Sequence, residues 1–187
     1  MKRLQKHLQR IAPTLGACLV AASLLACSTP SATRAETRAE LEAVAELDIP
    51  YASVPVPGLL CAGQIDEAQF DALVRAGYRS FVNLRLSSEP GTGWEGARAG
   101  SLGVEYANLP IANAGEISEA KAHDLARLLD AVRGPTVLYC GSSNRVGALL
   151  GAKAFYVDGA SPEEALELGR AAGVTRLESR LKELVGL

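Results

Sequence analysis

Several residue types are scarce in this 187-residue chain, and each scarcity excludes a class of protein. Aromatic residues make up only 5% of the sequence, so the core has few large side chains. Four cysteines are too few for a disulfide-built scaffold, and no Cys-x-x-Cys spacing suggests a zinc site. The formal net charge of -2 provides no basic field that would hold nucleic acid. The apolar share of 48% is nonetheless typical of an ordinary globular protein.

The first 26 residues have the order of charge and hydrophobicity that is found in secretory signals. Basic residues and no acidic ones occupy 2–10, and 11–26 is almost entirely apolar or small. This run is short for a membrane span. It ends in Leu24-Leu25-Ala26-Cys27, which resembles the lipobox of bacterial lipoproteins, where the cysteine is lipidated after cleavage. We therefore expect a lipoprotein signal peptide at 1–26 and a lipid anchor on a membrane at Cys27.

The residue after this cysteine and the loss of the signal both bear on the mature protein. Ser28 at that position is typical of an outer-membrane destination, so we expect the protein to be lipid-anchored in the outer membrane or the periplasm. The alternative is a plain secreted protein cleaved near Ala26. Without the signal, 15 basic residues stand against 21 acidic ones, which gives a charge of about -6. His7 is lost as well, so His123 is the only remaining histidine. We expect neither a metal site nor a cofactor.

Residues 27–56 have the composition of a flexible tether between an anchor and a domain. Serine, threonine, proline and alanine are frequent near its start, and 35–47 has the pattern of a short helix. Three residue pairs that end in proline follow and favour extended backbone.

The remaining residues, 57–187, alternate between strand and helix patterns, which predicts one α/β domain. Short apolar segments predict strands, and amphipathic segments between them predict helices. Two patterns near the C-terminus, beginning at Ser161 and Thr175, read as capping boxes. We expect a three-layer domain with a mostly parallel four-stranded sheet flanked by helices. The expected strands lie at 58–61, 80–84, 104–110 and 136–139.

The strongest indication of a functional site lies directly after the last predicted strand, in the segment from Cys140 to Arg145. A loop that joins a parallel strand to a helix directs backbone N–H groups inward, and the helix N-terminus adds positive potential, so this turn is suited to an anion. The same potential and Arg145 favour the thiolate form of Cys140, which makes it a nucleophile without a histidine base. The guanidinium of Arg145 can donate two parallel hydrogen bonds to phosphate or sulfate oxygens.

This segment, Cys-x-Ser-x-Asn-Arg-Val-Gly-Ala-Leu after a hydrophobic strand, resembles the cysteine-dependent phosphatase superfamily. More closely, it is similar to bacterial beta-lactamase-hydrolase-like, phosphatase-like domains, which are relatives of dual-specificity phosphatases. The likeness extends in order over nearly all of 57–187 and implies a protein-tyrosine-phosphatase-like fold. It continues at Gly63-Gln64, Asn83-Leu84-Arg85, Glu89, 103–106, Leu109-Pro110 and 165–173.

The resemblance implies hydrolysis of phosphomonoesters through a phosphocysteine intermediate. Cys140 would be the nucleophile, and the substrate would be a small phosphorylated or otherwise anionic molecule. The groups expected to hold the phosphoryl oxygens are Gly141, Ser142, Ser143, Asn144 and Arg145.

Some positions depart from the superfamily's usual pattern. Four residues rather than five separate Cys140 from Arg145. Relatives generally have glycine where Ser143 stands, so a positive φ there would strain the backbone. The usual aspartate is missing after the third predicted strand, and Glu116 is the nearest candidate for the general acid. A glutamate just before a helix is more often there for the helix dipole.

Two other functions would use the same residues. A rhodanese-like sulfurtransferase would carry sulfur as a persulfide on Cys140, because those enzymes also place four residues between cysteine and arginine; the upstream His-Ile-x-Gly-Ala segment of rhodaneses is absent from this sequence. A non-catalytic module would bind an anion or a phosphorylated ligand without hydrolysing it. Cys61 is either a buried core residue or a disulfide partner for Cys140.

Overall fold

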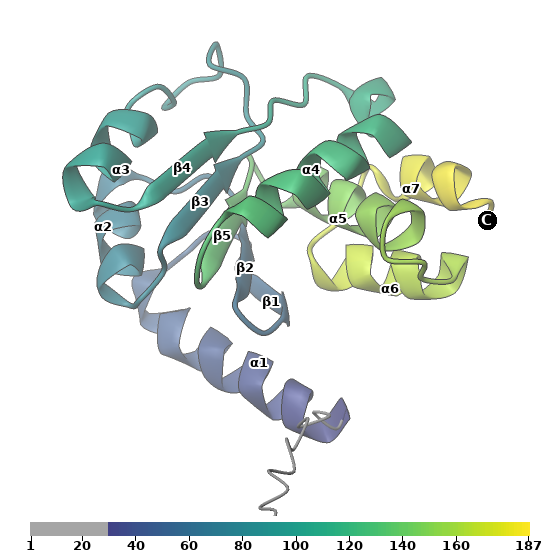
Figure 1. Cartoon of the computed structure of the whole chain (residues 1–187), viewed down its shortest axis with the longest axis horizontal. Coiled ribbons are helices and arrows are strands. Elements are labelled where there is room, and N and C mark those ends of the chain that lie inside the picture. The colour runs from purple at the N-terminus through teal and green to yellow at the C-terminus, as the bar shows by residue number, and fades with distance from the viewer. Residues whose placement is uncertain (1–29) are drawn as a thin grey trace, which may run out of the picture.

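The computed structural model describes residues 30–187 as one sheet with helices on both faces (Figure 1). The expected signal peptide and the lipidation site Cys27 lie outside the described residues. Among residues 30–187, none of the helices combines the length and hydrophobicity that a membrane crossing requires.

The sheet has five strands in the order β1-β2-β5-β3-β4. The strands β2, β5, β3 and β4 pair in parallel, with β5 at the centre, whereas β1 pairs antiparallel with β2. The prediction of a mostly parallel α/β sheet is confirmed, although the sheet has one strand more than expected. The bounds are β1 (Ser53–Val56), β2 (Leu59–Ala62), β3 (Ser80–Asn83), β4 (Glu105–Asn108) and β5 (Thr136–Tyr139).

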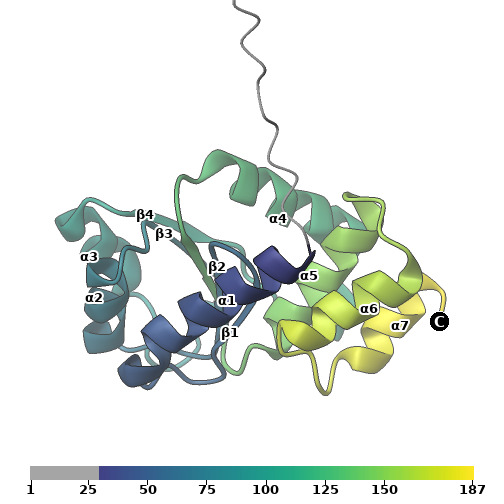
Figure 2. The ribbon, with the colours of Figure 1, turned by 90° about the horizontal axis from the view of Figure 1, so that it is seen from below.

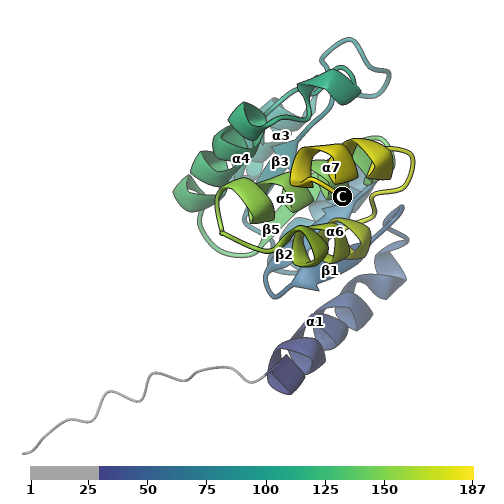
Figure 3. The ribbon, with the colours of Figure 1, turned by 90° about the vertical axis from the view of Figure 1, so that its right-hand side faces the viewer.

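The additional strand comes from the segment that we expected to be a tether. Helix α1 (Pro30–Val44) and the short 3-10 helix η1 (Ala45–Leu47) precede β1, and Figures 2 and 3 show α1 beside that strand. Val44 and Val54 are buried in the same apolar cluster as the residues of α2 and β3. We expected a tether because prolines are frequent in this segment. However, β1 is an edge strand, and a proline there, which has no N–H, does not have to interrupt the hydrogen bonds between strands. The residues just before 57 are therefore part of the domain.

Helices of two sets cover the two faces of the sheet, and each set encloses an apolar cluster (Figure 1). One face carries α2 (Glu67–Arg75) and α3 (Glu95–Leu102). A 3-10 helix, η2 (Ala114–Glu116), connects β4 to the helices of the other face. These are α4 (Glu119–Ala131), α5 (Asn144–Tyr156), α6 (Pro162–Ala171) and α7 (Glu178–Val185).

Local sequence explains where some helices begin. Asp66 and Ser161 form capping boxes at the starts of α2 and α6. Each side chain accepts the backbone N–H of the residue three positions later, and the side chain of that later residue accepts the N–H of the capping residue. The predicted capping box at Thr175 is wrong. Its N–H and Oγ1 both donate to Oδ1 of Asn144, at 2.8 and 3.2 Å, and the next helix begins only at Glu178.

Candidate active site

The loop after β5 lies at the carboxyl edge of the sheet, where the end of β2 fixes its first half. The Cys140 N–H donates to the carbonyl oxygen of Ala62 at 3.2 Å. Gly63 forms a bridge with Ser142, which continues the contact beyond the regular strands. Cys140 itself is only 1% exposed. The strand neighbours therefore place the sulfur in a defined position at the edge of the core.

The second half of the loop is fixed by the segment between α6 and α7. Ser143 is fully buried and has φ +57°, so the expected positive φ is present at this serine. Its Oγ donates to the carbonyl oxygen of Ala172 at 2.8 Å. Gly173 permits this close approach, because a Cβ there would lie 2.8 Å from the Cβ of Ser143. Asn144, at the start of α5, accepts the hydrogen bonds from Thr175 described above.

Arg145 is held by a carboxylate that comes from a loop 56 residues earlier in the chain. Its Nη1 and Nη2 donate to Oε1 and Oε2 of Glu89 at 2.6 and 2.8 Å, a parallel two-bond pair. Nη1 also donates to the carbonyl oxygen of Ile111 at 2.9 Å. These bonds fix the plane of the guanidinium next to Cys140.

Glu89 is itself held from its other side. The Nε of Arg85 donates to its Oε2 at 3.1 Å, and the Leu86 N–H donates to its Oε1 at 2.9 Å. The hydrogen bonds from Arg145, then those from Leu86 and Arg85, lower the pKa of Glu89 to about 2. The pKa of Arg145 is raised, mainly by Glu89 and more weakly by the charge of Cys140 and a hydrogen bond to it. Glu89 is thus ionised at neutral pH.

An open cavity of about 650 Å³ lies over this loop. Of the residues predicted to hold a phosphoryl group, Ser143 alone does not line the cavity, because its side chain points into the protein. The cavity also contacts Arg176, from the segment before α7, which sequence reasoning did not consider. The lining comprises Leu86, Glu89, Ala112, Asn113, Ala114, Cys140, Gly141, Ser142, Asn144, Arg145, Arg176 and Leu177.

Glu116, the predicted candidate for a general acid, does not line the cavity. Its Oε2 accepts the N–H of Ala112 at 2.9 Å and closes the turn that leads to α4. The carboxyl that the structure places in the cavity is Glu89. The sequence analysis notes Glu89 only as a point of family likeness, because its contact with Arg145, 56 residues away, could not be read from the local pattern.

Cys61 is fully buried on β2, and burial raises the pKa of its thiol. It is a free thiol in this structure, as is Cys140. Over residues 30–187, the structure brings together no group of three or more histidine, cysteine, aspartate or glutamate side chains that could hold a metal ion.

Comparison with known sequences finds a partial match to a curated protein. No family model matches the chain. The chain is 32% identical over 120 residues, or 62% of its length, to a beta-lactamase hydrolase-like protein of Xylella fastidiosa. The match spans about a quarter of that relative's length, 27%.

Solved structures resemble the chain over more of its length. A candidate phosphatase of the DUF442 group from Shewanella putrefaciens CN-32 has a TM-score of 0.58 and 17% identity, and the match covers 78% of this chain and 97% of the other. TpbA of P. aeruginosa in complex with phosphotyrosine has a TM-score of 0.53 and 20% identity, and the match covers 68% and 77% of the two chains. The chain therefore has the fold of these phosphatase-like structures, which confirms the fold that the sequence resemblance implied.

Proposed function

We propose that this protein is a phosphatase-like hydrolase that acts on phosphomonoesters through Cys140. The observation that carries the proposal is the position of Cys140 and Arg145 in one cavity, with the Arg145 guanidinium fixed by Glu89. A fixed guanidinium suits a phosphoryl group because it can stabilise charge that develops on the oxygens without first reorganising.

The reaction consists of two displacements at phosphorus. In the first, the Cys140 thiolate attacks phosphorus, the S–P bond forms, and the bond to the ester oxygen breaks. The electron pair leaves on that oxygen, which takes a proton. In the second, water attacks the phosphocysteine, the S–P bond breaks, and thiolate and inorganic phosphate are released. Arg145 and the N–H groups of the loop stabilise the phosphoryl oxygens in both steps.

The leaving group determines which esters react fastest. Of the described residues that line the cavity, Glu89 alone carries a carboxyl, and with a pKa of about 2 it holds no proton to donate at neutral pH. The leaving oxygen must then take its proton from water. Aryl phosphates, whose phenolates are stable as anions, are therefore the favoured substrates over alkyl phosphates.

The proposal is tested with the purified protein, p-nitrophenyl phosphate and a reductant. We expect steady turnover, a much lower rate with an alkyl phosphate, and complete loss of activity in Cys140→Ser. Cys61→Ser is the matched control, and it should retain activity as long as circular dichroism shows a folded protein. Absence of both burst and turnover from mildly acidic to mildly alkaline pH, in a folded sample, contradicts the proposal.

The same samples separate the two alternative functions. Release of thiocyanate from thiosulfate and cyanide, lost in Cys140→Ser, would favour the rhodanese-like sulfurtransferase. Tight binding of phosphate without turnover of any ester would favour the non-catalytic module.

A further inference from the structure

A second cavity, of about 560 Å³, adjoins the one over Cys140. Ser142 and Arg176 line both cavities. A molecule that places one group at Cys140 can therefore extend past these two residues into the second cavity. Its remaining lining comprises Tyr51, Ala52, Ser53, Arg170, Ala171, Gly173 and Thr175.

The second cavity has the chemistry of an anion site. Two arginines and four hydroxyl-bearing residues line it, and its lining includes no carboxyl among the described residues. Their guanidinium and hydroxyl groups can donate hydrogen bonds to phosphate oxygens, except the Thr175 hydroxyl, which already donates to Oδ1 of Asn144. The Oγ of Ser53 is a buried atom without a hydrogen-bond partner, so one of these groups is unsatisfied. This concentration of donors contrasts with the excess of acidic residues in the chain as a whole.

The two arginines of this cavity differ in their partners. Arg170 donates from Nε and Nη2 to the carboxylate of Glu178 at 3.1 and 2.6 Å, so its charge is already paired. Arg176 is exposed, and it makes no ion pair or hydrogen bond with any residue that the structure describes. Arg176 is therefore the cation that is free to bind a ligand, and it stands where the two cavities meet.

We propose that Arg176 and the second cavity bind a second phosphoryl group, carried by the same small molecule whose first phosphoryl group reacts at Cys140. The substrate class is then small bisphosphorylated molecules, and Arg176 is a specificity-determining residue. This inference rests on the proposed function, because it takes the first cavity as the phosphoryl site.

Binding to the full chain with Cys140→Ser tests the inference apart from turnover. The probes are 1,4-butanediol bisphosphate and 1,4-butanediol monophosphate, whose flexible carrier adapts to the spacing of the two sites. By isothermal titration calorimetry we expect the bisphosphate to bind about 10- to 100-fold more tightly than the monophosphate. Adding Arg176→Gln should abolish that preference by weakening bisphosphate binding far more than monophosphate binding, and Arg176→Lys should retain part of the preference.

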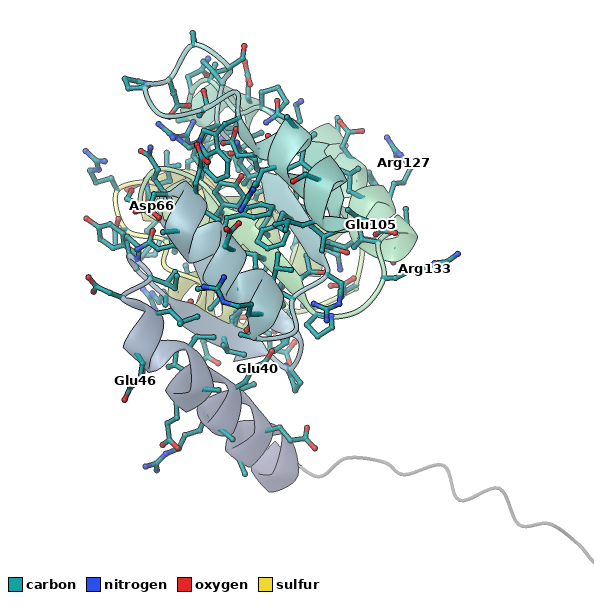
Figure 4. All side chains as sticks on the ribbon, turned by 90° about the vertical axis from the view of Figure 1, so that its left-hand side faces the viewer. Glu40, Glu46, Asp66, Glu105, Arg127 and Arg133 are labelled. Atoms are coloured by element: carbon teal, nitrogen blue, oxygen red, sulfur yellow. The ribbon has the colours of Figure 1, made fainter. Side chains whose placement is uncertain are left out.

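The matched control is Arg133→Gln. Arg133 is exposed (Figure 4). It precedes β5, whereas Cys140 follows β5, so the two residues lie at opposite ends of that strand. This variant removes the same charge and should keep the full preference for the bisphosphate.

The outcomes separate the inference from the proposed function. Equal affinity for the two probes, or a preference that survives Arg176→Gln, overturns the inference and leaves the phosphatase proposal intact. Binding of neither probe also overturns the inference, and turnover of p-nitrophenyl phosphate by the wild-type protein then decides whether the proposed function falls with it.

Discussion

Arg145 in the first cavity and Arg176 at the second differ in how many partners they have. In the first, Arg145 is fixed by both oxygens of Glu89 and by a backbone carbonyl, whereas Arg176 at the entrance to the second pairs with no described residue. A fixed guanidinium has already lost its side-chain entropy and is suited to charge that develops during a reaction. A free one loses that entropy only on binding and adapts to the position of a ligand group. We therefore propose a role in the reaction for Arg145 and a role in substrate selection for Arg176.

The largest expected effect comes from breaking the geometry at Arg145. Arg145→Lys keeps the positive charge but cannot donate a parallel pair to Glu89 and still face the phosphoryl group. We expect kcat/KM for p-nitrophenyl phosphate to fall by about 100-fold or more. Arg133→Lys, the same exchange at the far end of β5, should leave it unchanged. If Arg145→Lys retains more than about a third of the wild-type rate, positive charge alone is sufficient in the first cavity.

A smaller effect is expected when Arg145 is kept and its partner Glu89 is changed. Glu89→Gln preserves the shape of the partner but removes its charge, so Arg145 becomes more like Arg176. We expect kcat/KM to fall about tenfold, as for a positioning residue. Glu46→Gln on η1 is exposed and should not change the rate.

A pH series tests whether the Glu89 charge acts through its arginine and backbone partners. Because its partners lower the pKa of Glu89 from 4.5 to about 2, the ionised carboxylate stabilises the fold above pH 4.5, and this contribution is lost as the pH falls from 4.5 towards 2. The wild-type advantage over Glu89→Gln in the free energy of unfolding should therefore shrink across that window in urea titrations. An advantage that is constant with pH would show that the Glu89 charge does not act through Arg145 and its neighbours.

The comparison also shows which features could be predicted from sequence. Cys140 and Arg145 were found because they share one strand–loop–helix unit, in which local hydrophobicity and spacing determine the geometry. Glu89 was not recognised as the partner of Arg145 because its loop reaches that arginine only through the folding of the sheet. Thr175 fits a capping box locally, but Asn144, 31 residues away, binds its N–H instead. Long-range hydrogen bonds overrode the local pattern in both cases.

The smallest expected effect concerns Ser143, which directly follows Ser142, a loop residue that lines both cavities. Ser143→Ala keeps the positive φ and loses the buried hydrogen bond to Ala172, which should lower the free energy of unfolding by about 1–2 kcal/mol. Ser143→Gly also loses this bond but relieves backbone strain of about 1 kcal/mol, so its net change should be about 0–1 kcal/mol. Urea denaturation at neutral pH measures both, with the exposed Ser179→Ala as control. If Ser143→Gly is less stable than Ser143→Ala, the strain of the positive φ is small. The conformational entropy that glycine adds to the unfolded chain is then the larger of the two terms. If Ser143→Ala is as stable as the wild type, the bond to Ala172 does not contribute to stability, and the loop is held by Asn144 and by its contacts with the end of β2.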